Sequence, residues 1–257
     1  MAKYNTVVIK IGSSTLTTSK GTLDIANLSR IAAEAAKLVK KKIKVLIVTS
    51  AAIVSGSQKL GLKGKPSSIP QKQAAAAVGQ ATLMRQYEKA FERSKINVAQ
   101  ILLTRHEIEN QNRAENVRNC IFTLLKEGVV PIINENDAVA VDEIKYGDND
   151  TLSAMVATLI DADLLILLTD VDGFYVKDEK GKAVLINMIE EISEEIEKSA
   201  GASASMVGTG GMATKLQAAK IASRSGITTI IAHGRKKGLL EKIMQGKNVG
   251  TLINQKG

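Results

Sequence analysis

The densest group of polar side chains in the sequence follows the apolar segment 131–133 and ends at residue 150. A segment with apolar side chains at helical spacing begins directly after it. A solvated acidic loop is the simplest interpretation of such a charge run. So many carboxylates and amides between two apolar segments instead favour counter-charges or a polar ligand. The members of this group are Asn134, Glu135, Asn136, Asp137, Asp142, Glu143, Asp148, Asn149 and Asp150.

A lysine stands inside the apolar segment 5–12 near the start of the chain. An ammonium group is costly to bury unless it meets an anion, although a lysine at a sheet edge can also extend its side chain to solvent. Gly12 and Ser13 follow Lys10 closely and provide small side chains and backbone N–H groups. This combination is suited to binding a phosphate group.

A glycine-rich segment, 201–211, precedes a predicted helix over 212–225 and has Lys215 in the first turn of that helix. Backbone N–H groups of such a segment can hold phosphate oxygens at the positive end of a helix. The segment is not a Walker P-loop, because Lys215 follows Thr214 and precedes Leu216. It also fails as a dinucleotide fingerprint, since no apolar strand precedes it and no acidic residue ends the next strand. A flexible surface loop is the remaining alternative.

Two predicted strands end in polar residues, Thr49-Ser50 after 43–48 and Thr169-Asp170 after 164–168. Open α/β sheets bind ligands at the carboxyl ends of their parallel strands, although a serine that caps the next helix is the simpler interpretation of Ser50. Two lysines, phosphate-binding loops and a carboxylate cluster together predict phosphoryl transfer, which depends on positioning and charge compensation. A carboxylate between the two lysines would hold them apart and aligned.

The elements that must position these residues alternate between strand and helix almost throughout. Near-continuous apolar runs predict strands covered on both faces, and apolar residues at helical spacing predict the helices between them. The fold class is therefore α/β, with a mostly parallel central sheet and helices on both faces. One domain over residues 1–257 is expected. The predicted strands are 5–12, 43–48, 96–103, 129–133, 164–168 and 227–232, and the predicted helices begin at Asp24, Pro70, Asn112, the residue after Asp150, Ile189 and Met212.

Composition excludes several classes of protein. Hydrophobic residues at 44% and charged residues at 24% are typical of a globular protein, and neither a membrane span nor a signal peptide is predicted, which indicates the cytoplasm. Cys120 is the single cysteine, so a disulfide and a cysteine metal site are excluded. The net charge of +9 could attract nucleic acid, but with aromatic residues at 3% no nucleic-acid partner is expected.

Five blocks resemble the amino acid kinase family, in this order and across the whole chain: VVIKIGSS, VLIVTSAAI, PIINENDAVAVDEIKYGDNDTLSA, LLILLTDVDGFY and GTGGMATKLQAA. The resemblance implies a three-layer αβα sandwich, the amino acid kinase fold. The third and fifth blocks are the more specific ones. They resemble the branch of the family that uses ATP to phosphorylate the side-chain carboxylate of L-glutamate, the first step of proline biosynthesis.

The resemblance also implies roles by position. Lys10 and Lys215 would stabilise the transferring phosphoryl group, and Asp150 would orient both lysines. Mg²⁺ would arrive on the ATP phosphates, with no metal ligand from the protein. The residues implied to bind L-glutamate are Ser50, Asn134, Asp137, Asp148 and Asn149, and those implied to bind ATP are Lys10, Gly12, Ser13, Thr169, Asp170, Thr209, Gly210, Gly211, Met212, Ala213, Thr214 and Lys215.

Further implications concern partners and two departures from the family pattern. Proline as an inhibitor, a homo-oligomer and glutamyl phosphate reductase as a partner are expected. Ala51 stands where the family usually has the glycine of TSGAI, and an alanine would be strained there if the position requires a positive φ. Many members of this branch carry a C-terminal PUA domain, and none is expected here, since the sequence stops at Gly257.

Two other functions fit parts of the same pattern. A family member that phosphorylates a different carboxylate or a phosphate would share the lysines, but a phosphate acceptor would require arginines, and residues 131–154 contain none. A non-catalytic nucleotide or amino-acid sensor could use the same fold. The presence of Lys10, Lys215 and Asp150 argues against a sensor, because binding alone does not require them.

Overall fold

The computed structural model describes residues 4–62, 64, 66–140, 149–201 and 211–254. Its centre is an eight-stranded sheet in the order β3 (Val98–Leu103), β4 (Val130–Glu135), β2 (Lys44–Val48), β1 (Thr6–Ile11), β5 (Leu164–Thr169), β9 (Thr228–His233), β10 (Gly250–Ile253) and β8 (Met188–Ile189). Neighbouring strands are parallel except for β9 and β10. The prediction of a mostly parallel sheet is confirmed.

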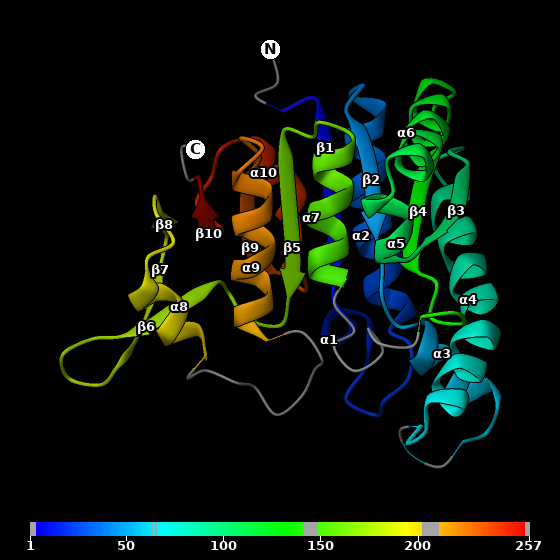
Figure 1. The fold of residues 1–257 in the computed structure, drawn as a ribbon, viewed down its shortest axis with the longest axis horizontal. Helices are drawn as coiled ribbons and strands as arrows, with labels where there is room; N and C mark the ends of the chain where they lie inside the picture. Colours follow the sequence, from blue (N-terminus) through cyan, green and yellow to red (C-terminus); the bar gives the residue numbers. More distant parts are fainter. Residues whose placement is uncertain (1–3, 63, 65, 141–148, 202–210, 255–257) are drawn as a thin grey trace.

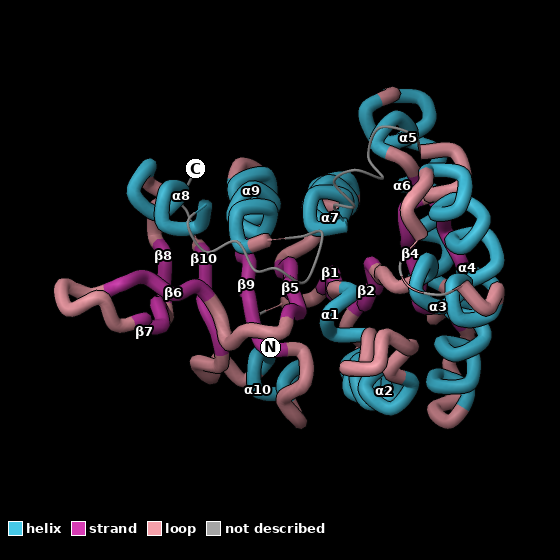
Figure 2. The backbone as a smooth tube through the Cα atoms, turned by 90° about the horizontal axis from the view of Figure 1, so that it is seen from below, coloured by secondary structure: helices cyan, strands magenta, loops and turns pink. Residues whose placement is uncertain are grey.

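Helices cover both faces of this sheet, as Figures 1 and 2 show. One face is covered by α5 (Arg105–Glu109), α6 (Gln111–Lys126), α7 (Asn149–Leu159), α8 (Glu194–Gly201) and α9 (Met212–Ser223). The other carries α2 (Ile25–Lys40), α3 (Ala52–Lys59), α4 (Ile69–Glu92) and α10 (Leu239–Met244), while the short α1 (Ser13–Leu16) follows β1. The three-layer αβα arrangement is therefore present, with a separate apolar core on each face.

Strand β1 contributes to both cores because its side chains alternate between the faces. Val7, Ile9 and Ile11 are buried in the core that includes α2, and Val8 is buried in the core that includes α7 and α9. Lys10 shares the face of Val8, as the sequence pattern predicts. The strand therefore directs this lysine toward α7 and α9 rather than toward solvent.

Several helices and strands begin or end at residues whose chemistry favours an element boundary. The carboxylate of Asp24 caps α2 by accepting the backbone N–H of Asn27 at 3.0 Å, and Pro70 lies in the first turn of α4. Gly128 and Gly226 follow α6 and α9 with φ values of 73° and 70°, which glycine adopts without steric cost. Residues 178–182 form the turn that joins β6 (Phe174–Lys177) to β7 (Ala183–Ile186) in an antiparallel hairpin.

Two helices differ from the prediction, one in its first residue and the other in which side chains are buried. The acidic helix predicted from Ile189 begins only at Glu194, because Met188 and Ile189 pair with β10 as an edge strand instead. The apolar side chains at helical spacing that follow Asp150 lie in α7, where Leu152 and Val156 are buried and Met155 and Leu159 are only half-buried. Three further buried positions of α7 carry small residues, which lets the helix pack closely against both the sheet and α9; they are Ser153, Ala154 and Ala157.

Helices α3 and α4 approach each other at two glycines. A Cβ added at Gly56 would lie 1.7 Å from the carbonyl oxygen of Ala75, and one added at Gly79 would lie 1.8 Å from that of Ala52. No larger side chain fits at either position without moving the helices. This contact fixes α4 against α3, which itself begins at the end of β2.

Within the described part of the chain, no helix has the length and apolarity required to cross a membrane.

Candidate active site

The candidate residues collect at one edge of the sheet. Strands β1, β2, β4 and β5 are parallel, so their carboxyl ends meet at the same edge, which is the lower one in Figure 1. Lys10 lies near the end of β1, and Ser50 and Thr169 lie at the ends of β2 and β5. Helices α7 and α9 begin at this edge as well, which brings Asp150 and Lys215 to it.

Two lysines bind the two oxygens of one buried carboxylate. Lys10 Nζ lies 2.5 Å from Asp150 Oδ1, and Lys215 Nζ lies 3.1 Å from Asp150 Oδ2. The exposed fractions are 5%, 0% and 4% for Lys10, Asp150 and Lys215, so all three charges are removed from bulk water. Burial alone would raise the pKa of Asp150, but the positive charges of the lysines outweigh it and hold this pKa at about 2. The group, called the lysine–aspartate cluster below, carries one net positive charge.

The first turn of α9 adds a neutral contact to this cluster. Thr214 Oγ1 lies 2.8 Å from Asp150 Oδ2 and 2.8 Å from the carbonyl oxygen of Gly211, and its hydroxyl can donate to either. Gly211 precedes Met212 as the N-cap of α9. The end of the glycine-rich segment is thus held beside the two lysines.

Amide and hydroxyl side chains from β2, β4 and α7 meet on one side of the lysine–aspartate cluster. Asn149 Nδ2 lies 2.9 Å from the carbonyl oxygen of Thr49, 3.0 Å from Ser50 Oγ and 3.1 Å from Asn134 Oδ1. These side chains are buried. Within the described part of the chain, Asn149 Oδ1 is buried and has no hydrogen-bond partner. The arrangement leaves an acceptor atom available for a ligand.

Asp137 lies in the turn that follows β4, three residues after Asn134. Its side chain is half-buried, and this burial raises its pKa to about 6. A carboxylate in such a position is stabilised by a positively charged ligand group, because the ligand supplies the counter-charge that solvent no longer does.

On the other side of the cluster, β1 and β5 supply the residues around a compact turn. Gly12 is the N-cap of α1, and a Cβ added to it would lie 3.6 Å from Lys10 Nζ. Its N–H donates to the carbonyl of Leu168 at 3.2 Å, so Gly12 provides space beside the lysine rather than the predicted free donor. Thr169 and Asp170 follow at the end of β5, linked by a 3.1 Å hydrogen bond between their side chains.

Distant side chains hold the backbone of α1 in place. Asn27 donates to the carbonyl oxygen of Thr15 at 2.8 Å, and Arg235 donates to that of Thr17 at 2.8 Å. Arg235 also binds Asp24 at 2.6 Å. The turn that contains Ser13 is therefore fixed from both α2 and the segment after β9.

The lysine–aspartate cluster thus has the polar side chains of Ser50, Asn134 and Asn149 on one side and the turn at Gly12 on the other. The sequence was compared with known proteins that could share this arrangement. The amino acid kinase family matches residues 5–233. The chain belongs to this family. A protein named glutamate 5-kinase from Geobacter metallireducens is 50% identical to it over 98% of this chain and 68% of the relative. A protein of the same name from Clostridium acetobutylicum is 49% identical over 98% of this chain and 96% of the relative.

Solved structures share the amino acid kinase fold at low identity. Carbamate kinase from Giardia lamblia, bound to AMP-PNP, superposes with a TM-score of 0.67 at 19% identity, over 99% of this chain and 100% of that one. UMP kinase from Bacillus anthracis superposes with a TM-score of 0.62 at 17% identity, over 99% and 97%. At such identities these likenesses support the fold alone.

Three of the site residues implied by the family resemblance lie outside the described part of the chain: Asp148, Thr209 and Gly210. The remaining ones all lie at the carboxyl edge of the sheet or in the first turn of α9. The sequence did not indicate that Gln80, Tyr87 and Gln100 would be linked to this site by hydrogen bonds. A buried glutamine and tyrosine seven residues apart on one helix face were the available signal, since a helix brings such positions onto the same side.

Ala51, the departure from the family pattern, has φ 78° and ψ 12°. This is the left-handed region, in which the Cβ of alanine crowds the neighbouring carbonyl. The residue is buried at the N-cap of α3, directly after Ser50. The strain expected from the sequence is therefore present beside the polar cluster.

We expect Ala51→Gly to stabilise the protein by about 1 kcal/mol, because relief of the left-handed strain exceeds the added backbone entropy of the unfolded chain. Urea unfolding would measure the difference. Ala77→Gly, at an exposed position inside α4, is the matched control and should lose about 1 kcal/mol. Equal destabilisation by both changes would contradict this explanation.

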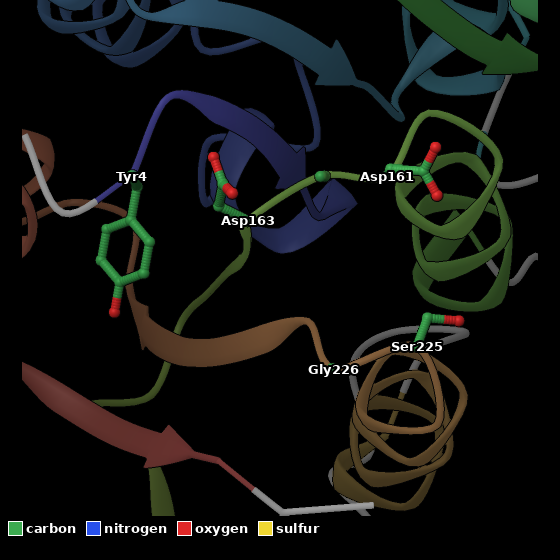
Figure 3. Close-up of a pocket in the computed structure, with 6 residues that line it drawn as sticks. Tyr4, Asp161, Asp163, Ser225 and Gly226 are labelled. Atoms are coloured by element: carbon green, nitrogen blue, oxygen red, sulfur yellow. The ribbon is translucent and has the colours of Figure 1, made fainter.

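A cavity of about 390 Å³ lies elsewhere, at the amino ends of β1, β5 and β9 (Figure 3). The carboxylate of Asp163 in its wall already accepts the backbone N–H groups of Asn5 and Thr6 at 2.7 and 2.8 Å. The cavity is on the opposite edge of the sheet from Lys10. Its lining residues are Tyr4, Asp161, Ala162, Asp163, Ser225 and Gly226.

Proposed function

We propose that this chain is a kinase that transfers the γ-phosphoryl group of ATP to the side-chain carboxylate of L-glutamate. The observation that carries the proposal is the buried lysine–aspartate cluster, which lies between an amide-rich cluster and a turn suited to phosphates. Relatives that are named glutamate 5-kinase and are about half identical over 98% of the chain support this acceptor.

In the proposed reaction a carboxylate oxygen of glutamate attacks the γ-phosphorus. A new P–O bond forms, the bond to the β-phosphate oxygen breaks, and the products are an acyl phosphate and ADP. Negative charge shifts to the oxygen that leaves with ADP while the transferring group remains anionic. Lys10 and Lys215 are proposed to neutralise this charge, and Asp150 to hold both ammonium groups in place before the substrates bind.

The acceptor is proposed to bind on the side of β2, β4 and α7. Asp137 would pair with the α-ammonium group of glutamate, and Asn149 Oδ1 would accept a further hydrogen bond from it. Ser50 and Asn134 would provide polar contacts to the carboxylates, with Asp148 as a neighbour. A carboxylate at position 137 disfavours a phosphate acceptor by charge repulsion, in agreement with the absence of arginine in 131–154.

ATP is proposed to bind on the side of β5 and α9, against Gly12, Ser13, Thr169, Asp170 and the segment from Thr209 to Lys215. Both oxygens of Asp150 already bind lysines, so this carboxylate is not free for a cation. The part of the chain that the structure describes contains no cluster of acidic, histidine or cysteine side chains suited to a metal. We propose that Mg²⁺ enters with ATP as part of the substrate.

The proposal extends to regulation and location. The acyl phosphate is reactive, so its transfer to a glutamyl phosphate reductase would limit hydrolysis. Inhibition by proline, assembly into a homo-oligomer and a cytoplasmic location complete the proposal. Each of these rests on the family resemblance.

An acceptor panel tests the proposal directly. ADP release with MgATP would be measured against glutamate, aspartate, N-acetylglutamate and UMP, with hydroxylamine present to trap an acyl phosphate as a hydroxamate. Glutamate-dependent ADP release together with hydroxamate is expected. Turnover with another acceptor alone would overturn the substrate, and ATP binding without any turnover would favour a sensor.

We expect kcat/KM for glutamate to fall about tenfold per pH unit below pH 6, because protonated Asp137 no longer attracts the ammonium group. The activity falls toward acid because the carboxylate of Asp137 is ionised above about pH 6 and neutral below it. Initial rates at low glutamate between about pH 5 and 8 would measure the effect. Asp137→Asn should raise the KM for glutamate far more than that for ATP and remove this acid limb. An unchanged limb in that variant would assign it to another group.

A further inference from the structure

Side-chain amides form a hydrogen-bonded chain that leads away from the proposed glutamate site. Asn149 Nδ2 donates to Asn134 Oδ1 at 3.1 Å, and Asn134 Nδ2 donates to Gln80 Oε1 at 3.0 Å. Gln80 Nε2 then donates to Gln100 Oε1 at 3.1 Å. The first three side chains are buried, and Gln100 is exposed on edge strand β3. The chain therefore connects the site to the surface through α4.

Two backbone groups fix the directions of Asn149 and Asn134, and these in turn fix those of Gln80 and Gln100. The carbonyl of Thr49 can only accept, so the nitrogen of Asn149 must face it at 2.9 Å. The N–H of Glu135 can only donate, so the oxygen of Asn134 must face it at 2.9 Å. The nitrogen of Asn134 is then left for Gln80, whose oxygen accepts it. Among the oxygens of these four linked amides, within the part of the protein that the structure describes, Asn149 Oδ1 at the substrate end is the one without a hydrogen-bond partner.

A second residue of α4, seven positions after Gln80, also contacts the site. The hydroxyl of Tyr87 lies 2.7 Å from Thr49 Oγ1, and burial raises the pKa of Tyr87 well above its usual range, which keeps it neutral. Thr49 is the residue whose carbonyl accepts Asn149. Gln80 and Tyr87 thus share one face of α4, and both bind residues at the ends of strands that border the site.

We propose that Gln80 is a positioning residue for the acceptor, acting through Asn134 to keep Asn149 Oδ1 directed toward the ammonium group of the substrate. This inference rests on the proposed function. Without Gln80 the buried N–H₂ of Asn134 loses its acceptor, and an unsatisfied buried donor is costly enough to reorient the side chain. Asn134 would then rotate, and Asn149 would lose the partner that sets its direction.

Gln80→Met tests this role, since methionine keeps the length and apolar volume of glutamine but offers no strong acceptor. We expect the KM for glutamate to rise about tenfold while the KM for ATP changes less than about twofold. Gln86→Met, at a half-buried position on the same helix, is the matched control and should leave both constants unchanged. Equal changes in both KM values, or none, in Gln80→Met would overturn the proposal.

Two further variants separate positioning from packing. Gln80→Glu retains an acceptor for Asn134, and the exposed Gln100 can turn its amide toward the new carboxylate, so the KM for glutamate should recover to within about threefold of wild type. If Gln80→Met is not recovered as a folded protein, Gln100→Met decides: about a threefold rise in the KM for glutamate alone is expected, and wild-type constants would overturn the proposal. Absence of glutamate turnover in the wild-type protein would instead refute the proposed function, before any variant is measured.

Discussion

Asp150→Asn should lower kcat by about 10³-fold with little change in the KM for ATP. The carboxylate is fully buried and holds Lys10 Nζ at 2.5 Å and Lys215 Nζ at 3.1 Å on separate oxygens. A neutral amide removes the negative charge between two ammonium groups, which then repel each other in a medium where water cannot screen them. Both lysines lose their alignment together, so the loss exceeds that expected from either lysine alone.

Steady-state kinetics with saturating glutamate and ATP measure this loss. Asp161→Asn, an exposed aspartate that follows α7 and pairs with Arg118, is the control and should retain wild-type kcat. Circular dichroism should show that the Asp150→Asn protein is folded. If that folded variant kept more than about a tenth of wild-type kcat, Asp150 would not be the group that orients the lysines.

Lys10→Ala and Lys215→Ala should each lower kcat by about 10²-fold or more, the scale for loss of one electrostatic stabiliser of a transition state. The two side chains come from different elements, β1 and α9, and share one carboxylate. Because they act as a unit, the double variant should lose less than the product of the two single losses. Rapid-quench measurement of the chemical step would separate this effect from product release.

Lys220→Ala is the matched control on α9, where the partly exposed Lys220 pairs with Glu197 at 2.6 Å. It should turn over at the wild-type rate. Near-normal turnover in either Lys10→Ala or Lys215→Ala would remove that lysine from the proposed mechanism.

Much of the fold could be predicted from the sequence because its strands are buried on both faces and read as apolar runs. The runs at β1, β2 and β5 and the alternation with helices specified a parallel sheet. Strand β8 could not be predicted, since two residues carry no periodicity and their pairing with β10 depends on a segment far away in the sequence. The same pairing shortened the predicted acidic helix.

The charged part of the site could be predicted from the sequence for a physical reason. A lysine in a buried strand and another at a helix start each require an anion, and Asp150 stands at the start of a buried helix. The chain of hydrogen-bonded amides through Gln80 could not be predicted from the sequence. Periodicity places Gln80 on the buried face of α4, but its contact with Asn134 spans 54 positions and depends on the close crossing at Gly56 and Gly79.

We propose that the side-chain carboxylate of glutamate becomes the phosphoryl acceptor beside the lysine–aspartate cluster. This transfer is tested most directly with glutamate labelled with ¹⁸O in that carboxylate alone. The attacking oxygen becomes the bridging oxygen of the acyl phosphate, and hydroxylamine then attacks the carbonyl carbon and releases this oxygen with phosphate. Mass spectrometry of the phosphate should find one ¹⁸O per ADP formed. Unlabelled phosphate released in step with ADP would mean that water is the acceptor and would contradict transfer to glutamate.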